Sequence, residues 1–304
     1  MKILVAVDDS PSSSCVLNAA LTSLWPNQTA FTVLNVVNVL RFERLPALIE
    51  DATAEGQRIV QAAVAQFVQR GYHAEGVALP GHPRAEISSY AKELGADLVL
   101  IGSHGHGAVG RFLLGSVAQG VLRTAPCSVE IVRCRLTGRQ RTSEGSMNVL
   151  LGTDGSACSV AAANAVATQV WPEGSLFRIV SVEELMLVGN QMEASSLAAM
   201  YPASQLEVLE KLARDRATSA ADEANSILTK AGCKVVEASC PLGDPRNIIL
   251  ELAKAWPADL IVLGSHGRRG LDRLLMGSVS ESVAIHAACS VRVIRASLAA
   301  HNVT

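Results

Sequence analysis

Apolar and polar residues follow two rhythms along this chain. Short runs that are almost continuously aliphatic, such as 3–7 and 97–102, are typical of strands buried on both faces of a parallel sheet. The first half of the chain has five predicted strands, at 3–7, 31–37, 73–78, 97–102 and 128–133. Predicted helices lie between them, at 13–24, 53–70, 85–94 and 116–124. This alternation predicts an α/β fold, an open parallel sheet with helices on both faces.

The same pattern occurs again in the second half of the chain. Residues 1–10 read MKILVAVDDS and residues 147–156 read MNVLLGTDGS. Matching residues are 146 positions apart at the start of the two copies and 162 positions apart from Gly81 and Gly243 onward. The second copy therefore holds a net insertion of 16 residues, which falls between Val182 and the helix that follows.

The repeat predicts two tandem domains. We expect the first domain at 1–134 and the second at 147–304, joined by a polar linker at 135–146. The inserted region of the second copy, 184–204, is apolar for a loop. It is interpreted as a cover for a site in the second domain, as a partner-binding segment, or as a packed extension of the following helix.

Composition limits the classes of function. The 304 residues are 49% hydrophobic and 18% charged, with a net charge of −2, so a folded core is expected and extensive nucleic-acid contact is not. We expect neither a signal peptide nor a membrane-spanning helix, because no apolar run approaches ~18 residues, and we predict a cytoplasmic protein. An odd number of cysteines without C-x-x-C spacing predicts reduced thiols, with neither a disulfide framework nor a metal site. These cysteines are Cys15, Cys127, Cys134, Cys158, Cys233, Cys240 and Cys289.

A glycine-rich loop follows the fourth predicted strand of each copy. In the first copy Gly102 and Gly105 are followed, after nine residues, by Gly115 and Ser116. Glycines let the backbone approach a ligand closely, and the unbonded amides at the start of a helix suit a phosphate. The alternative is a plain turn and helix cap, but the spacing recurs, which favours a phosphate-binding loop. The second copy repeats it with Gly264, Gly267, Gly277 and Ser278.

A carboxylate ends the first predicted strand of each copy. Asp8 and Asp154 would lie beside the glycine loop if the first and fourth strands are neighbours, because ligands bind at the carboxyl ends of parallel strands where the strand order reverses. A carboxylate there can accept a hydrogen bond from a ribose hydroxyl or a base amine. The alternative is that it caps the first helix.

With these motifs the chain resembles the universal stress protein family, and in particular its tandem, ATP-binding members. The resemblance rests on the V-D-x-S end of the first strand, a G-x-P element and the spaced glycine loop, and it covers both copies. It implies two Rossmann-like, five-stranded parallel sheets of strand order 3-2-1-4-5. It also implies that ATP binds with Mg²⁺. Contacts with adenine or ribose are implied for Asp8 and Asp154, and backbone contacts with the adenine edge for Val36 and Val182. The cradle for ribose and phosphates would be Gly102, Gly105, Gly115, Ser116 and Val117, and Gly264, Gly267, Gly277, Ser278 and Val279.

The resemblance also implies a role. It suggests a sensing or signalling protein of the stress response, with weak ATP hydrolysis or phosphorylation at most and no catalytic residues. The last strands of the two copies, 128–133 and 290–295, are apolar edge strands that would pair as an intramolecular pseudo-dimer, and whole chains could form a homodimer. The alternative function is a tandem stress protein that has lost nucleotide affinity and acts through protein or lipid partners. A third, an enzyme of the related adenine-nucleotide α-hydrolase class, needs a catalytic constellation that the sequence does not offer.

Two departures bear on these expectations. The first copy has Asp9 where the second has Gly155, and an extra carboxylate would repel a polyphosphate or help to hold a metal ion, so the first site is expected to be the weaker one. The first copy also contains a literal G-x-G-x-x-G, at 105–110, which suggests a dinucleotide fingerprint. The second copy loses that pattern and keeps the longer one, so the dinucleotide interpretation is rejected. His104 and His266 recur in the loops, where hydrogen bonding or phosphate contact is favoured over catalysis.

Overall fold

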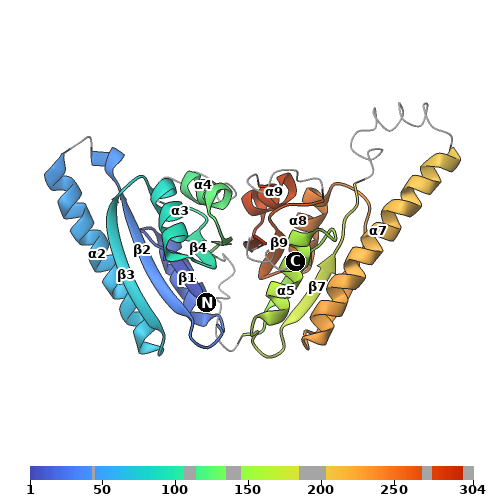
Figure 1. Cartoon of the computed structure of the whole chain (residues 1–304), viewed down its shortest axis with the longest axis horizontal. Helices are drawn as coiled ribbons and strands as arrows, with labels where there is room; N and C mark the ends of the chain where they lie inside the picture. The colour runs from blue at the N-terminus through green and yellow to red at the C-terminus, as the bar shows by residue number, and fades with distance from the viewer. Residues whose placement is uncertain (43–44, 106–113, 135–144, 185–202, 269–275, 297–304) are drawn as a thin grey trace, which may run out of the picture. The chain divides into compact units, whose positions relative to one another are not determined.

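The computed structural model describes residues 1–42, 45–105, 114–134, 145–184, 203–268 and 276–296 (Figure 1). The chain divides into two compact units. The first unit contains Met1–Gly145 together with Gln169–Glu173 and Ala284–Val293. The second contains Ser146–Thr168, Gly174–Val283 and Ile294–Thr304. The expected domain boundaries stay a prediction, and most of the expected linker and insertion lies outside the described residues.

The first unit contains a parallel sheet whose strand order is β3-β2-β1-β4-β5. This is the order that the family resemblance implied, and the predicted α/β fold class is confirmed. The strands are β1 (Lys2–Ala6), β2 (Ala30–Asn38), β3 (His73–Gly81), β4 (Leu98–Gly102) and β5 (Ser128–Val132). The helices are α1 (Pro11–Thr22), the 3-10 helix η1 (Val39–Phe42), α2 (Pro46–Gln69), α3 (Pro83–Leu94) and α4 (Ser116–Thr124).

Three α-helices of the first unit begin at a proline. Pro11, Pro46 and Pro83 each occupy the first turn of a helix, where the missing amide hydrogen costs nothing. The predicted helix at 53–70 was therefore too short, because α2 begins at Pro46 and includes a first stretch that lacks the strict helical spacing of apolar residues. Gly95 ends α3 with a φ of 63°, the left-handed conformation expected of a glycine C-cap.

The second unit repeats this construction. Its strands pair in parallel in the order β9-β6-β7-β8, and the amide of Ser265, just after β9, donates to the carbonyl of Ile294 at the end of β10. The strands are β6 (Asn148–Gly152), β7 (Leu176–Val180), β8 (Val235–Ser239), β9 (Leu260–Gly264) and β10 (Ser290–Ile294). The helices are α5 (Ala157–Thr168), α7 (Ala203–Lys230), α8 (Pro245–Ala255) and α9 (Ser278–His286).

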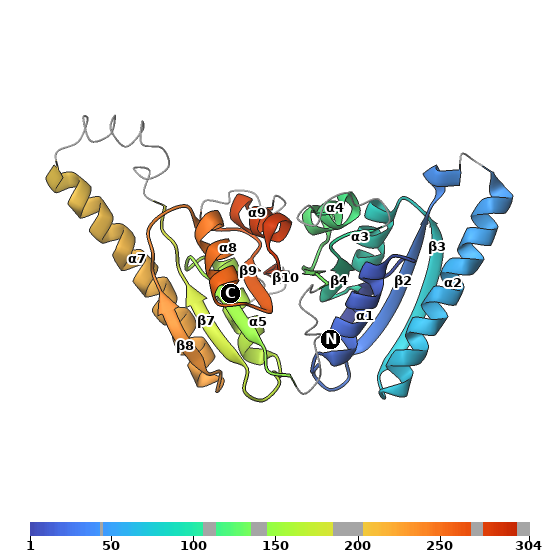
Figure 2. The same ribbon diagram turned by 180° about the vertical axis from the view of Figure 1, so that it is seen from behind.

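Long helices cover equivalent strands in the two units. In the first unit α2 packs on β2 and β3, and in the second α7 packs on β7 and β8 (Figures 1 and 2). The second ladder contains an irregularity, because Phe177 pairs with Val235 while the next residue, Arg178, pairs with Glu237. Val236 is thus an extra residue in β8, typical of a bulge. This extra residue explains why Gly71 and Gly232, before the position of the bulge, are 161 positions apart, whereas Gly81 and Gly243, after it, are 162 apart.

The edge of the first sheet pairs with a strand from the end of the chain. Residues 291–293 of β10 belong to the first unit and run antiparallel to β5, with Arg292 opposite Glu130. The two side chains form an ion pair of 2.6 Å with exposures of only 7% and 1%. Such a buried pair is weak evidence for stability, because the cost of desolvating both charges offsets their attraction.

A disulfide joins Cys15 in α1 to Cys134, which follows β5. The expectation that the cysteines are reduced thiols was wrong for this pair. The two residues are 119 positions apart in sequence, and the packing of α1 against β4 and β5 brings them together. Neither the odd number of cysteines nor their spacing reveals such a contact. Among the helices of the described part, none has the length and hydropathy to cross a bilayer.

Candidate functional site

The first cleft lies in the first unit at the carboxyl ends of β1, β2 and β4. Its cavity of 460 Å³ is lined by the loop after β1, the end of β2, the glycine loop after β4 and the start of α4. All seven residues that the resemblance assigned to the first site line this one cavity. They are Asp8, Val36, Gly102, Gly105, Gly115, Ser116 and Val117.

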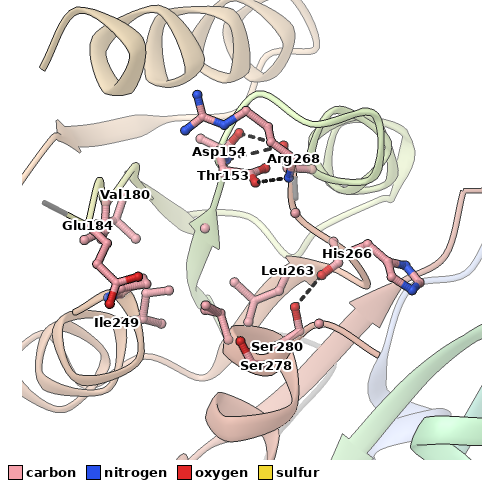
Figure 3. A pocket seen from close by; sticks show the side chains of 18 of the residues that line it. Thr153, Asp154, Val180, Glu184, Ile249, Leu263, His266, Arg268, Ser278 and Ser280 are labelled. Atoms are coloured by element: carbon pink, nitrogen blue, oxygen red, sulfur yellow. Dashed lines mark hydrogen bonds between the residues drawn. The ribbon is translucent and has the colours of Figure 1, made fainter. Parts of the chain in front are cut away.

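The second cleft occupies the equivalent place in the second unit (Figure 3). Its cavity of 730 Å³ is larger, and it is bounded by the ends of β6, β7 and β9 and by the start of α9. The structure again brings together the seven expected residues, which are distributed over more than a hundred positions of sequence. They are Asp154, Val182, Gly264, Gly267, Gly277, Ser278 and Val279.

Close packing explains why glycine occupies the loop positions. A Cβ on Gly267 would lie 2.7 Å from Oδ2 of Asp154, and a Cβ on Gly105 would lie 3.0 Å from Oδ2 of Asp8. A Cβ on Gly264 would lie 2.6 Å from the carbonyl carbon of Cys158, in the first turn of α5. The missing side chains therefore let the carboxylate, the loop and the first helix approach one another around the cavity.

The helix that closes each cleft presents unbonded amides. The first intrahelical bond of α4 runs from Gln119 to Gly115, and that of α9 runs from Glu281 to Gly277. The amides of residues 116–118 and 278–280 therefore precede the helical ladder, where their partial positive charge suits an anion.

One part of the expected cradle has another role. The amides of Gly115 and Gly277 donate to the carbonyls of Ser103 and Ser265, at 2.7 and 2.8 Å. These two amides close the glycine loop and are already used. The amides that remain to face an anion are those of the residues that follow, Ser116 and Val117 in α4 and their counterparts in α9. The two glycines thus contribute by leaving room for a ligand.

The end of β2 offers a second set of backbone groups. Leu34 accepts a hydrogen bond from Val7, on the β1 side, so Val36, two residues later, directs its amide and carbonyl to the same side after β1 has ended. In the second unit Val180 accepts from Thr153 and Ser181 donates to Ser239 on the opposite side. By the same alternation Val182 faces the second cleft. An N–H and a C=O side by side match the edge of an adenine.

The two aspartates are held differently. Oδ1 of Asp8 accepts hydrogen bonds from the amide and hydroxyl of Ser10 and from the hydroxyl of Ser13. Oδ1 of Asp154 accepts from the amide of Ser156 at 3.0 Å, and its Oδ2 accepts from the amide of Arg268 at 3.0 Å. In the first unit the helix-cap alternative is not what is seen, because Ser10 is the N-cap of α1. Both carboxylates instead close the loop after the first strand, at the rim of the cavity.

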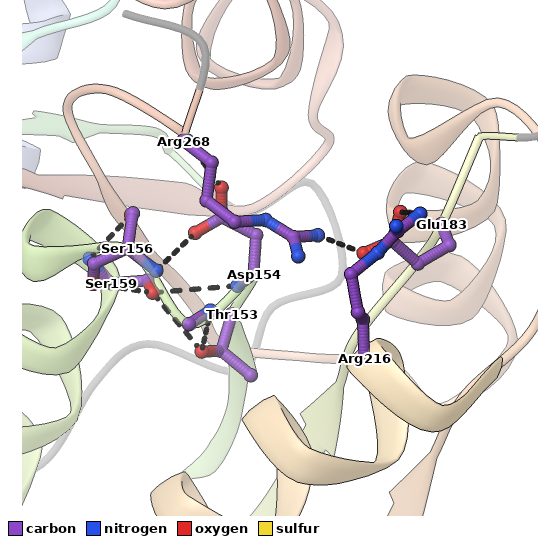
Figure 4. Close-up of polar contacts among 8 residues, drawn as sticks. Thr153, Asp154, Ser156, Ser159, Glu183, Arg216 and Arg268 are labelled. Atoms are coloured by element: carbon purple, nitrogen blue, oxygen red, sulfur yellow. Dashed lines mark hydrogen bonds and ion pairs between the residues drawn. The ribbon is translucent and has the colours of Figure 1, made fainter. Parts of the chain in front are cut away.

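Three charged residues of the second cleft were missed by the sequence analysis. Glu183, with a side chain only 8% exposed, forms ion pairs with Arg268 of the glycine loop and with Arg216 of α7 (Figure 4). The distance from Arg216 Nη2 to Glu183 Oε2 is 3.5 Å. All three line the cavity. A signal was present, because aligning Gly71 with Gly232 places Glu55 of the first cleft opposite Arg216.

The two loop histidines bond to their neighbours. Nδ1 of His104 and of His266 lies 2.9 Å from the hydroxyl of Ser103 and of Ser265, respectively. Burial lowers the pKa of His266 below its usual value, and the positive charge of Arg295 adds to this shift. In the part of the chain that the structure describes, His, Cys, Asp and Glu do not gather into a group of three or more suited to a metal ion.

Comparison with known proteins shows a match in both copies. A family model described as the universal stress protein family matches residues 1–133 and 146–295. A universal stress protein of Mycobacterium bovis is 27% identical over 302 residues, covering 94% of each chain. The universal stress protein YxiE of Bacillus subtilis is 30% identical over 145 residues, which is 43% of this chain and 98% of that protein. In structure, a universal stress protein of Archaeoglobus fulgidus is similar with a TM-score of 0.65 at 21% identity, covering 97% and 98% of the two chains.

Proposed function

The chain belongs to the universal stress protein family, and from its two clefts we propose that it binds adenine nucleotides. ATP, accompanied by Mg²⁺, is the proposed ligand, and the bound state serves a sensing or signalling role in a stress response. The proposal rests on three kinds of group that line the same cavity in each unit. They are the amides at the start of α4 or α9, the backbone amide and carbonyl of the valine after the second strand, and the carboxylate after the first strand. These groups fit phosphate, adenine edge and ribose, respectively.

The size and chemistry of both cavities support a nucleotide. Volumes of 460 and 730 Å³ fall within the roughly 300–1,000 Å³ of ordinary small-molecule sites. Their position at the carboxyl ends of β1 and β4, or of β6 and β9, is where nucleotides bind in open parallel sheets. Among the described residues that line the clefts, no nucleophile is hydrogen-bonded to a base that an acid in turn orients, and binding is therefore proposed rather than turnover.

The proposal extends to association and location. The antiparallel pairing of β5 with β10 supports an intramolecular pseudo-dimer of the two copies, and a homodimer of whole chains is compatible with it. A cytoplasmic location is proposed with the nucleotide, since ATP is plentiful there. The alternative function, a tandem stress protein that acts through protein or lipid partners without nucleotide, predicts empty clefts at millimolar ATP.

Isothermal titration calorimetry with Mg-ATP tests the proposal. The wild-type chain is expected to bind two nucleotides, Gly115→Val and Gly277→Val one each, and the double variant none. A Cβ at position 277 would lie 3.0 Å from the carbonyl of Ser265, so this variant also strains the loop. Ser278→Asp is the milder companion, because a carboxylate at a helix start is tolerated by the fold while it repels a phosphate.

The outcomes separate the two functions. Loss of one bound nucleotide in Ser278→Asp, with an unchanged melting temperature, supports a phosphate at the start of α9. Stoichiometric binding retained by the double glycine variant would refute the proposed site. No heat at millimolar ATP with the wild-type chain would favour the partner-binding alternative.

A further inference from the structure

The second cleft carries a cationic group that its predicted role in binding ATP does not use. Arg268 comes from the loop after β9 and Arg216 from α7, and both contact the buried carboxylate of Glu183. Each guanidinium has five N–H donors, and one carboxylate occupies only part of them. These three residues carry two positive charges and one negative charge, and the other acids that line the cavity are Asp154 and Glu184. Charges inside such a cavity are screened less than in water.

This group lies at the opposite end of the cavity from the helix start. Arg268 donates its backbone amide to Asp154 at 3.0 Å, so its side chain begins beside the carboxylate proposed to hold the ribose. In Figure 3 that side chain points away from Ser278, at the start of α9. In Figure 4 it reaches past Asp154 to Glu183 and Arg216. The cleft therefore has two separate places for negative charge, one at α9 and one beside the ribose.

The first cleft lacks the corresponding group. Alignment of Gly71 with Gly232 puts Glu55 at the place of Arg216, and Glu55 lines the first cleft with its carboxylate. Val37 stands at the place of Glu183. The counterpart of Arg268, His106, is outside the described residues. The arrangement of two arginines around a carboxylate is thus a property of the second cleft alone among the residues described.

We propose that the second cleft selects an adenosine that carries a phosphate on its 2′ or 3′ ribose oxygen in addition to its 5′ phosphate. This inference rests on the proposed function. The 5′ phosphate takes the amides at the start of α9, and the ribose phosphate takes the free donors of Arg216 and Arg268. Planar guanidinium groups hold phosphate oxygens through paired N–H donors, and an arginine near the ribose is a recurring means of accepting a 2′-phosphate.

Glu183 has a positioning role in this site. Its carboxylate bridges Arg268 and Arg216, which come from the glycine loop and α7, and orders two long side chains before the ligand arrives. Ordering them in advance lowers the entropic cost of binding. Arg268 donates to Oε1 of Glu183 and Arg216 donates to Oε2, so Glu183→Gln replaces one acceptor with an NH2 donor and leaves one arginine unheld. This variant should therefore lower the affinity for a ribose phosphate.

Competition between isomers tests the inference. The probes are ADP, adenosine 2′,5′-bisphosphate and adenosine 3′,5′-bisphosphate, which carry the same number of phosphates in different places. Calorimetry on a Gly115→Val background reports the second cleft only. We expect at least one bisphosphate to bind roughly tenfold to a hundredfold more tightly than ADP. The stronger of the two isomers identifies whether the 2′ or the 3′ oxygen carries the phosphate.

Variants locate the effect. Arg216→Ala and Arg268→Ala should reduce bisphosphate affinity to about the level of ADP affinity, a larger loss than either variant causes for ADP itself. Arg246→Ala is the matched control, since Arg246 pairs with Asp244 and does not line the cavity. Equal or tighter binding of ADP by the wild-type chain, or an equal loss in the Arg246 control, overturns the inference and leaves the proposed function intact. Failure of every adenine nucleotide to bind overturns both.

Discussion

The two clefts share a backbone and differ in charge. Each has the same loop closure after the fourth strand, the same helix start and the same outward-facing valine at the strand end. The described lining of the first cleft includes the acids Asp8, Asp9 and Glu55 and neither lysine nor arginine. That of the second includes the acids Asp154, Glu183 and Glu184 and, in addition, Arg216 and Arg268. Both copies thus share the backbone geometry that is proposed to hold a nucleotide, and they differ in the charged side chains at the rim of the cleft.

The surroundings of the two clefts also differ. The first unit is tied by a disulfide from α1, whose first turn lines the first cleft, to the chain just after β5. The equivalent positions of the second copy are Ala161 and Ala296. The second cleft instead has an ion-pair network on its rim. The first unit thus has a disulfide between two distant segments, and the second cleft has ion pairs between Glu183 and two arginines. Reductant should therefore affect the stability of the first unit alone.

Removal of the disulfide gives the largest expected effect. Cys15→Ala, or reduction of the wild-type chain, should destabilise the first unit by about 5 kcal/mol, the chain-entropy value for a closed loop of over a hundred residues. The second unit has no equivalent bond and serves as the internal control. Differential scanning calorimetry with and without reductant should show one transition that falls and one that stays. If reductant lowered the melting temperature of both transitions, or of neither, the disulfide would not stabilise the first unit selectively.

The next largest effect is expected from adding a side chain at the last glycine of β4 or of β9, where the two units leave different amounts of space. A Cβ on Gly264 would meet backbone atoms of Cys158 and Ser159 at 2.6–2.8 Å, whereas a Cβ on Gly102 would meet only Ser12 Cβ at 2.8 Å within that range. Backbone cannot move aside as easily, so Gly264→Ala should cost about 3 kcal/mol and Gly102→Ala about 1 kcal/mol. Urea unfolding of the two variants measures the difference. Equal losses of unfolding free energy in the two variants would contradict this, because they would mean that the start of α5 moves aside as easily as the start of α1.

Charge at the rim of the first cleft gives a smaller effect. Asp9→Asn removes a carboxylate from the described lining and keeps the shape of the side chain. We expect ATP to bind the first cleft about threefold to tenfold more tightly, because one repulsive charge near the polyphosphate is lost. Titration on a Ser278→Asp background isolates this cleft. Weaker binding would instead indicate that Asp9 holds the metal ion of Mg-ATP.

Acid pH gives the smallest effect, confined to the second unit. The pKa of His266 lies below its unfolded value of about 6.5 because burial disfavours the charged ring. As pH falls through the unfolded pKa, the unfolded chain takes up a proton before the folded chain does, so the stability contributed by the neutral ring is lost as pH falls from 7 toward 5. His266→Asn should flatten this part of the pH profile of melting temperature. An unchanged profile in the variant would contradict the assignment.

Much of the fold and of the site follows from the sequence. The duplicated pattern of strands and helices, the spaced glycines and the two aspartates predicted which segments meet, and the fourteen expected residues gather into two cavities. This succeeds because strand ends and helix starts are positioned by the backbone topology, which local sequence periodicity specifies.

Other features could not be predicted because they depend on packing between distant segments. Cys15 and Cys134 meet only after α1 packs against β5, and no spacing rule links them. Arg216 reaches Glu183 from a long helix whose alignment with the first copy shifts by one residue at the bulge in β8. The amides of Gly115 and Gly277 already donate to carbonyls within the glycine loop. Only the structure shows this, because the sequence does not reveal which amide donors are bonded.

A crystal structure of the chain grown with saturating Mg-ATP tests the central claim most directly. The expected result is adenine hydrogen-bonded to the amide and carbonyl of Val182, with phosphate oxygens within hydrogen-bonding distance of the amides of Ser278 and Val279. An ordered second cleft that stays empty of nucleotide, or one that holds ATP with its phosphates away from α9, would contradict the claim.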